Sequence, residues 1–402
     1  MGLVGLAHGV SHFSQLLLPP LFPWLKDAFA VSYTQLGAML TVFFAVSCAV
    51  QALSGFWVDK HGPRPILFAG LGLITLAALG FAASTGYAML AAFAVLAGIG
   101  NGVFHPVDYT LLNRRIAKPR LAHAYSVHGI SGSLGWALAP ALLVPIAMAS
   151  SWRVALVCAA LLALSVLLLL VLRRRDLVLT DLPPSAGAAA ASPTATTGSE
   201  GRFDFLRIPA VWMCFGFFFF YAGALSVVQT FAPAAAAQLH AVPLPWVALC
   251  LTVYMVCSAG GMVVGGFLAA KPERSERIVG LAFAAAAGLA LLVALAPLPG
   301  LAVPVLFGLM GFVSGTAGPS RDLLVKRSTP DNATGRVYGV VYAGLDIGQA
   351  AVPLVIGALM DRQQWRGVWL ALALLQGVLI VSAFNVRRVR RTLLAPTTAT
   401  AL

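Results

Sequence analysis

Charged residues are scarce in this sequence. Only 10% of its 402 residues are Asp, Glu, Lys or Arg, whereas 60% are hydrophobic. A soluble globular domain carries about 25% charged residues. The polar residues are too few to cover a water-soluble core of this length, so a soluble fold is excluded. Lipid suits this composition, and helices that satisfy their own backbone hydrogen bonds can span it.

Acidic residues are rarer still, at 13 against 26 Lys and Arg, which gives a net charge of +13. Nucleic-acid binders share such an excess, but their basic residues form surface stripes or aromatic-interleaved patches. Here the basic residues form short clusters between long apolar runs, which is typical of membrane topology. We therefore expect a lipid bilayer as the partner, and no nucleic acid.

Sequence signals of catalysis, cofactors and export are also missing. The five cysteines lie in apolar runs without a CxxC pair, so they are interpreted as small apolar residues. There is no phosphate-binding GxxxxGK[ST] loop, and no nucleophile–base arrangement suggests an enzyme. We expect no cofactor and no catalytic residue. The N-terminus lacks a basic region and a cleavage site, so no signal peptide is expected.

Long apolar runs dominate the chain, and each is near the roughly 20 residues that a spanning helix needs. Twelve spans are predicted, at 3–25, 33–58, 65–83, 87–108, 122–146, 152–172, 209–231, 245–269, 278–297, 300–319, 336–359 and 366–384. With the N-terminus inside, 22 of the 26 Lys and Arg residues fall on the cytoplasmic side. The distribution predicts a multi-pass protein of the bacterial-type inner (plasma) membrane with both termini cytoplasmic.

A change of composition divides the chain. Residues 182–201 are rich in Ala, Ser, Thr, Pro and Gly and have no apolar period, which indicates a flexible linker. We expect an N-terminal six-helix bundle at 1–172, a cytoplasmic linker at 173–207 and a C-terminal six-helix bundle at 208–402.

The two halves repeat each other. When the sequence is aligned with itself so that Gly98 meets Gly311, further Gly, Pro, Tyr and Trp-Arg positions coincide without a gap. A shift of one more position brings Gln15 and Pro19 onto Gln229 and Pro233. Chance apolar similarity does not align such residues. Parallel repeats with an even number of helices are the arrangement of one large transporter class.

The loop between the second and third spans carries a signature. The segment from Gly55 through Asp59, Lys60 and Gly62 to Arg64 resembles the signature loop of the major facilitator superfamily, and the spans, linker and repeat extend the resemblance over the whole chain. Two departures are Pro63, where the family has a basic residue, and Ala270 in the second copy, where it has Asp.

The resemblance implies a role for this loop in conformational switching. Asp59 would accept hydrogen bonds from a neighbouring helix N-terminus, and Arg64 would bridge the bundles in one state. The alternative is that both merely anchor a tight turn. The element Val103-Phe104-His105-Pro106, with histidine in the first helix, is similar to the fosmidomycin-resistance branch of efflux carriers.

Ionisable groups at membrane depth indicate function by default. His8, His12 and Gln15 share one face of the first helix because they are spaced by four and three residues. They are candidates for a proton or substrate site. A metal pair and a purely packing role remain alternatives, and no metal is our first expectation.

Three further groups are expected near the middle of the membrane: His105, His128 and Asp346. On helices that the resemblance assigns to the cavity wall or its flank, they suggest proton coupling, because a histidine can change charge near physiological pH. The alternative is that each is a satisfied interior polar group. The remaining candidates for the cavity wall are Tyr221, Gln229 and Tyr342.

Asp108 and Arg321 coincide when Gly98 is aligned with Gly311, and they therefore occupy equivalent places in the two halves. We predict that they form a cytoplasmic gate that is closed when the carrier opens outward. In the alternative, Asp108 pairs with Arg114 or Arg115, and Arg321 pairs with Asp322.

The leading interpretation is a monomeric secondary active transporter that works by alternating access. It is expected to export a drug-like or small anionic metabolite by proton antiport. Uptake of a small organic anion by proton symport is the alternative, and a membrane receptor or enzyme is a distant one.

Overall fold

The structure is a computed structural model that describes residues 1–117, 120–179, 209–269, 275–328 and 334–394. Its elements in the first half are α1 (Gly2–Gln15), α2 (Phe22–Phe29), α3 (Tyr33–His61), α4 (Pro63–Ala83), α5 (Tyr87–Asn101), α6 (Phe104–Arg115), α7 (Leu121–Ala149) and α8 (Trp152–Leu172). In the second half they are α10 (Pro209–Thr230), α11 (Ala232–His240), α12 (Leu244–Leu268), α13 (Ser275–Leu295), α14 (Ala302–Ser328), α15 (Thr334–Asp361) and α16 (Trp365–Leu394).

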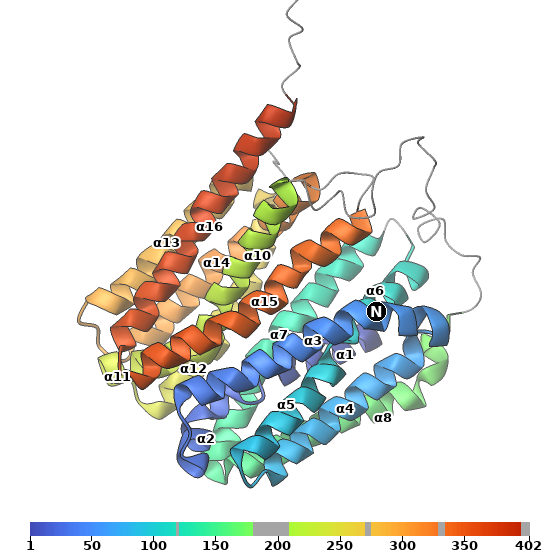
Figure 1. The fold of residues 1–402 in the computed structure, drawn as a ribbon, viewed down its shortest axis with the longest axis horizontal. Coiled ribbons are helices and arrows are strands. Elements are labelled where there is room, and N and C mark those ends of the chain that lie inside the picture. Colours follow the sequence, from blue (N-terminus) through green and yellow to red (C-terminus); the bar gives the residue numbers. More distant parts are fainter. Residues whose placement is uncertain (118–119, 180–208, 270–274, 329–333, 395–402) are drawn as a thin grey trace, which may run out of the picture.

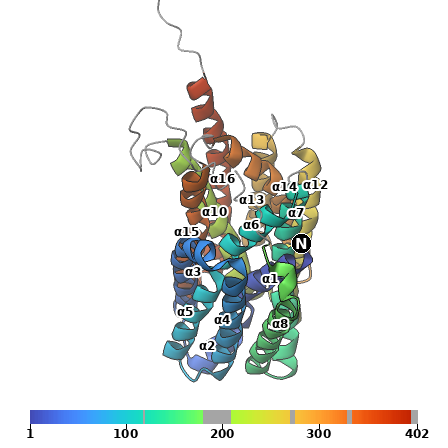
Figure 2. The same ribbon diagram turned by 90° about the vertical axis from the view of Figure 1, so that its right-hand side faces the viewer.

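The described chain is all-helical, as the sequence predicts. Ten of its segments are long and apolar enough to cross a membrane, and α5 with α6 counts as one of them. The first predicted span corresponds to α1 and α2 together, and the twelfth predicted span corresponds to the last helix, α16. Figure 2 shows α3, α4, α5 and α8 of the first half in its lower part and α10, α13, α14 and α16 of the second half in its upper part, with α6 and α7 of the first half beside α12 and α14. The division into two six-helix bundles stays a prediction.

The prediction of one continuous first helix at 3–25 is wrong. α1 ends at Gln15, and a 3₁₀ turn at Pro19–Leu21 leads into α2. Proline has no N–H to donate, and it disfavours helical geometry in the residue before it. Pro233 accompanies the same break between α10 and α11, so the repeat reproduces it in the second half.

The fourth predicted span, 87–108, also differs. The chain turns at Gly102 and Val103, and a new helix, α6, then runs on to Arg115. In the second half, α14 continues unbroken through the equivalent position, Gly315. The turn therefore belongs to the first half alone, and it comes directly before Phe104 and His105.

Contacts between the halves follow a twofold pattern. The Thr41 hydroxyl of α3 donates to the carbonyl of Ala350 on α15 at 2.5 Å, and the Thr252 hydroxyl of α12 donates to that of Ala137 on α7 at 3.4 Å. Ala137 and Ala350 coincide in the alignment of the two halves. The repeat seen in the sequence is thus a repeat in space.

Closely packed glycines obey the same relation. A Cβ on Gly98 would meet the carbonyl of Phe43, and one on Gly311 would meet that of Tyr254. These glycines let α5 approach α3 and α14 approach α12, because small residues allow close contact between helices.

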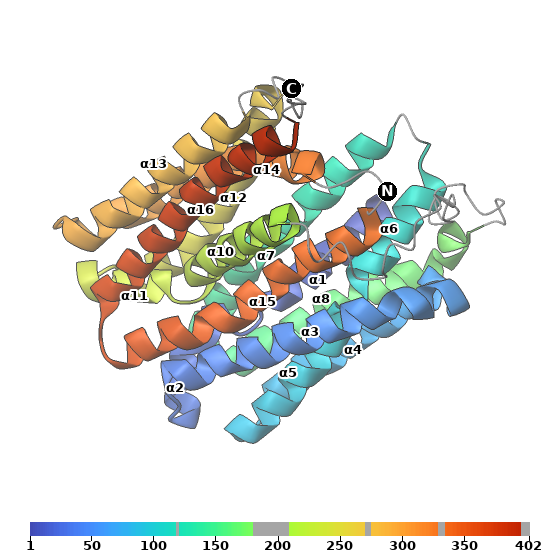
Figure 3. The same ribbon diagram turned by 45° about the horizontal axis from the view of Figure 1, so that its top comes forward.

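The halves are tightly joined at the end of the molecule where α2 and α11 lie. Figures 1 and 3 show α3 and α15 side by side, with α2 and α11 toward one end and the N-terminus toward the other. Phe22 packs near Phe231, with ring centroids 5.7 Å apart, and the backbone N–H groups of Tyr33 and Thr34 donate to the Asp361 carboxylate at 2.6 and 2.9 Å. The largest apolar cluster draws side chains from both halves.

The beginning of the predicted linker packs on the first half. A 3₁₀ turn, Arg174–Leu177, follows α8, and Leu177 is buried against the cluster around α4 and α6. The Arg115 guanidinium donates to the Val178 carbonyl at 2.9 Å. Residues 180–208, which hold the rest of the predicted linker, lie outside the described residues.

Candidate functional site

Four histidines meet inside the first half. His8 and His12 lie one turn apart on α1, with ring centroids 4.3 Å apart. The ring of His8 stacks on that of His128 from α7 at 3.4 Å between centroids, and the His105 ring of α6 lies 5.8 Å from it. We call these four residues the histidine cluster. All four were singled out from the sequence, and the structure brings them together.

Local backbone features make this meeting possible. The turn before α6 places His105 at the start of a helix, where its side chain reaches α3. Gly132 of α7 faces α1 because a Cβ there would lie 2.7 Å from the His12 ring and 2.8 Å from the His8 ring. Only a glycine leaves room for both imidazoles at this position.

A hydrogen-bonded aspartate–histidine pair borders the cluster. Asp108 is fully buried, and its Oδ2 lies 3.1 Å from Nε2 of His128. The second carboxylate oxygen of Asp108 has no hydrogen-bond partner. Asp108 is therefore paired with His128 in this structure, and not with Arg114 or Arg115, the two partners that the alternative prediction named.

Gln51 connects the histidine cluster to the second half. Nδ1 of His105 lies 2.8 Å from Oε1 of Gln51 on α3, and the Gln51 amide donates to Asp346 of α15 at 3.4 Å. The thiol of Cys48, on the same face of α3, also hydrogen-bonds to Asp346. Asp346 is therefore held at the seam between the halves by residues of the opposite half.

A second polar network extends the site along α1. The Gln15 side-chain amide donates to Oδ1 of the Asn101 side chain at 3.3 Å, and its oxygen accepts from the indole N–H of Trp136 at 2.9 Å. Asn101 in turn accepts from Ser11 and donates to Ser47. Gln15, predicted from its position on the histidine face, is thus fully engaged in packing three helices together.

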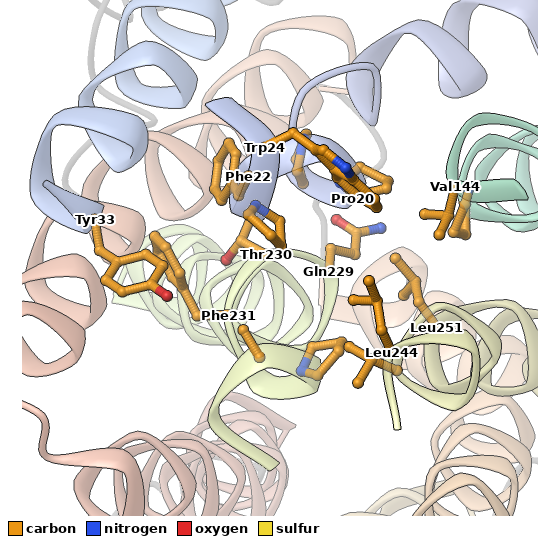
Figure 4. A pocket seen from close by; sticks show the side chains of 16 residues that line it. Pro20, Phe22, Trp24, Tyr33, Val144, Gln229, Thr230, Phe231, Leu244 and Leu251 are labelled. Atoms are coloured by element: carbon orange, nitrogen blue, oxygen red, sulfur yellow. The ribbon is translucent and has the colours of Figure 1, made fainter. Parts of the chain in front are cut away.

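A small cavity of about 50 Å³ lies at the α2/α11 end of the molecule, where the two halves are in contact. Figure 4 shows its walls, among them Trp24, Tyr33, Gln229 and Leu251. Gln229 is buried, and its amide nitrogen has no hydrogen-bond partner. The structure therefore places Gln229 in the joint between the halves, away from the histidine cluster.

The predicted gate residues are not paired with each other here. Among the described residues, the hydrogen-bond partner of Asp108 is His128, whereas the guanidinium carbon of Arg321 lies 4.3 Å from the ring centroid of Tyr221 and 5.6 Å from that of Phe218. The gate stays a prediction for the conformation that is open at the α2/α11 end. The side chain of Asp322 lies outside the described residues.

The signature loop caps α3. Asp59 is exposed near the end of α3, and Gly62 ends the helix with φ of +80°, a conformation that favours glycine. Arg64 lies in the first turn of α4 and is partly exposed, and Gly55 has open space where a side chain would be. The switching role of this loop stays a prediction. The side chain of Tyr342 lies outside the described residues.

Sequence reasoning missed the residues that connect the site. Gln51 and Asn101 are single amides inside apolar helices, and Trp136 lies three residues after Ser133 on α7. A lone amide within a predicted span is a usable signal, since polar groups at membrane depth need partners. Its partner could not be identified, because the contact depends on the turn between α5 and α6.

Comparisons with known proteins agree with this architecture. The fosmidomycin resistance protein of Escherichia coli (strain K12) is 31% identical over 148 residues, which are 35% of each chain. A probable sulfoacetate transporter of Cupriavidus necator is 25% identical over 160 residues, covering 39% of this chain and 36% of that one. The matches thus span about a third of the length of these curated relatives.

One solved structure matches nearly the whole fold. It is a bacterial homolog to the human lysosomal transporter Spinster in an inward-facing and occupied conformation, with a TM-score of 0.77, 14% identity and 96% coverage of both chains. The family model of the Major Facilitator Superfamily matches residues 4–320 and 301–401. The family model covers most of the described chain and confirms the predicted family: the chain belongs to the Major Facilitator Superfamily.

Proposed function

We propose that this transporter is a proton-coupled exporter of small organic anions, with Asp346 as the coupling group. The observation that carries the proposal is the position of Asp346. It is the carboxylate of one half that is held by Gln51 and Cys48 of the other half.

Alternating access requires the contact between α3 and α15 to change. When the halves rock, the Gln51–Asp346 hydrogen bond stretches or breaks, and the surroundings of the carboxylate change with it. A carboxylate at membrane depth is stabilised as an anion by donors and water, and as an acid by their removal. The proton affinity of Asp346 is thus tied to the conformation of the carrier.

The neighbours of Asp346 suit this role. Among the described residues, the titratable group in contact with it is the Cys48 thiol, and His105 lies one hydrogen bond further away, through Gln51. On the other side of α15, Gly344 and Gly348 pack against the backbone of Phe215 and Phe219 on α10, which brings no charge to that contact. In this proposal the histidine cluster lines the same polar path.

The substrate class rests on charge and on the relatives. Fosmidomycin and sulfoacetate are both small anions, and they are named in proteins similar to this one. Arg321 is a cation of the second half near Tyr221. Export is favoured because the Escherichia coli relative is named for resistance. Uptake by proton symport is the second candidate, favoured by Arg321 as an anion ligand and by the sulfoacetate relative.

The test is transport by the purified full chain in proteoliposomes with an imposed pH gradient. Phosphonates, sulfonates and carboxylates are offered as labelled substrates. Antiport predicts that substrate accumulates in the compartment with the higher proton concentration, and symport predicts the opposite. Transport that ignores the gradient for every substrate that exchanges would overturn proton coupling.

Asp346→Asn separates coupling from binding. The variant should lose accumulation driven by the gradient while it still exchanges labelled for unlabelled substrate. Asp176→Asn makes the same change at an exposed position in the turn after α8, away from the Gln51 contact and from the joint between the halves, and should keep accumulation. Equal accumulation by Asp346→Asn and the unaltered chain would remove Asp346 from the mechanism.

A further inference from the structure

The histidine cluster has more buried nitrogen atoms than hydrogen-bond partners. Nε2 of His8 and both ring nitrogens of His12 are buried without a hydrogen bond of good geometry, and the polar groups nearest to these rings are the backbones of His128 and Gly132. An unpaired buried polar atom destabilises the folded chain. Histidines that only pack a helix interface would be expected to satisfy these atoms.

Three of the rings have converging nitrogens. One ring nitrogen from each of His8, His12 and His105 lies within 4.8 Å of the others. A metal ion bound to imidazole nitrogen at about 2.0–2.1 Å in tetrahedral geometry needs these atoms about 3.4 Å apart. Small side-chain rotations close this difference, because His8 and His12 already face the same side of α1.

Hydrogen bonds at Nδ1 of two rings leave Nε2 available as a ligand. Nδ1 of His8 lies 3.3 Å from the Ser131 hydroxyl, which itself donates to the His128 carbonyl and can therefore accept from His8. Nδ1 of His105 lies 2.8 Å from the Gln51 carbonyl oxygen, and the Gln51 amide donates to Asp346. In both cases a protonated Nδ1 leaves Nε2 as an unprotonated ligand, which is the usual arrangement of metal-bound histidine.

A buried negative charge adjoins the three nitrogens. Asp108 is 0% exposed, one of its oxygens is unpaired, and its nitrogen neighbours are His128 and, within 4.8 Å, His8. A divalent cation among three neutral imidazoles would be attracted by this carboxylate in a medium of low polarity. The surroundings thus favour a cation over an anion.

We propose that His8, His12 and His105 form a binding site for a divalent transition-metal ion. Imidazole ligands select ions of the Zn²⁺, Ni²⁺, Co²⁺ and Cu²⁺ group over Mg²⁺ and Ca²⁺, which prefer oxygen. Three protein ligands leave a fourth position for a water molecule. All three ligands belong to the first half, so the site is not taken apart when the halves rock.

The site is tested by Co²⁺ binding to the purified full chain, which is prepared with an affinity tag that contains no histidine. Four-coordinate Co²⁺ gives intense visible absorption bands, so the site reports its own geometry. The expected result is one bound Co²⁺ per chain that is displaced by Zn²⁺ and not by Mg²⁺. A folded chain that shows no such bands with excess Co²⁺ would overturn the proposal.

Variants locate the ion. His12→Gln and His105→Gln should each lose the absorption bands, and Gln51→Leu should weaken binding about 10- to 100-fold, because it removes the partner that orients His105. His240→Gln is the matched control, since this histidine bonds to the Val293 carbonyl in the second half, and it should bind as the unaltered chain does. Unchanged binding by both His12→Gln and His105→Gln contradicts the assignment.

Two further measurements keep the result decisive. Size-exclusion profiles show whether each variant is folded, and Zn²⁺ should raise the melting temperature of the unaltered chain and of His240→Gln but not of His12→Gln. Asp346→Asn should retain the Co²⁺ bands. Failure of the metal site can therefore be distinguished from failure of the proposed proton coupling.

Discussion

The two halves share one scaffold and differ in their interior chemistry. In the first half, Gln51 of α3 bonds to His105 of α6. At the equivalent place in the second half, Met262 of α12 lies against Gly318 of α14, with 3.7 Å from a Cβ on that glycine to the methionine side chain. The backbone contacts are shared by the halves, whereas this polar pair is present only in the first of them among the described residues.

The aspartate–histidine pair shows the same contrast. Asp108 and His128 are paired in the first half, and the residues aligned with them in the second half are Arg321 and Val341. The comparison teaches that the helix contacts follow the repeat, whereas the residues of the proposed sites lie where the two halves differ.

Breaking the aspartate–histidine pair should have the largest effect on stability. His128→Leu makes the first half resemble the apolar second half and leaves the buried Asp108 carboxylate without a partner. Removal of one member of a buried pair costs about 3–5 kcal/mol. The expected result is a large drop in melting temperature and in the yield of folded protein in detergent.

The double variant His128→Leu with Asp108→Asn provides the control, because it removes the buried charge as well. It should recover part of the lost stability. Equal stability of His128→Leu and the unaltered chain would mean that the pair contributes nothing to the first half.

A smaller loss is expected when the glycine beside the histidine rings is filled. Gly132→Ala places a methyl group against His8 and His12, and overpacking of this kind costs about 1–3 kcal/mol. Thermal unfolding measures it. Gly129→Ala, one turn earlier on α7 with nothing within 4 Å, should leave the melting temperature unchanged. A similar loss in both variants would indicate a general effect of alanine on α7.

The mildest change concerns the joint between the halves. Asp361 accepts two backbone hydrogen bonds at the N-terminus of α3, and the place equivalent to Asp361 is Met148. Loss of a charge at a helix N-terminus is worth about 0.3–1 kcal/mol, so Asp361→Asn should raise the population open at the α2/α11 end roughly 2- to 5-fold.

Spin-label distances across this end would detect the shift. Labels on Ala30 and Gln363 lie next to the joint without taking part in its hydrogen bonds. Unchanged distance distributions in Asp361→Asn would show that the carboxylate does not hold the halves together.

Much of the fold could be predicted from the sequence, because the contacts that define the first half recur at aligned positions of the second. Gly98 and Gly311, or Pro19 and Pro233, identify helix contacts and breaks by their type alone. The histidines of α1 could be grouped because helical spacing places them on one face. The pairing of His128 with Asp108 could not, since it depends on how α6 leaves the turn at Gly102.

The partner of Asp108 shows where reasoning from the repeat stops. Equivalent position suggests that Asp108 faces Arg321 in the outward-open conformation, yet in the present conformation the buried carboxylate takes the nearest donor, and His128 is in contact with it. Position within a repeat predicts where a residue lies, whereas its partner depends on the side chains that differ between the halves.

The most direct test of the account is the proton flux that accompanies substrate movement. A pH-sensitive dye enclosed in proteoliposomes would report it for the unaltered chain and for Asp346→Asn at equal rates of substrate exchange. The account predicts a proton signal with the unaltered chain and none with Asp346→Asn. A proton signal of the same size in both would contradict the claim that this carboxylate at the seam couples the two halves to the proton gradient.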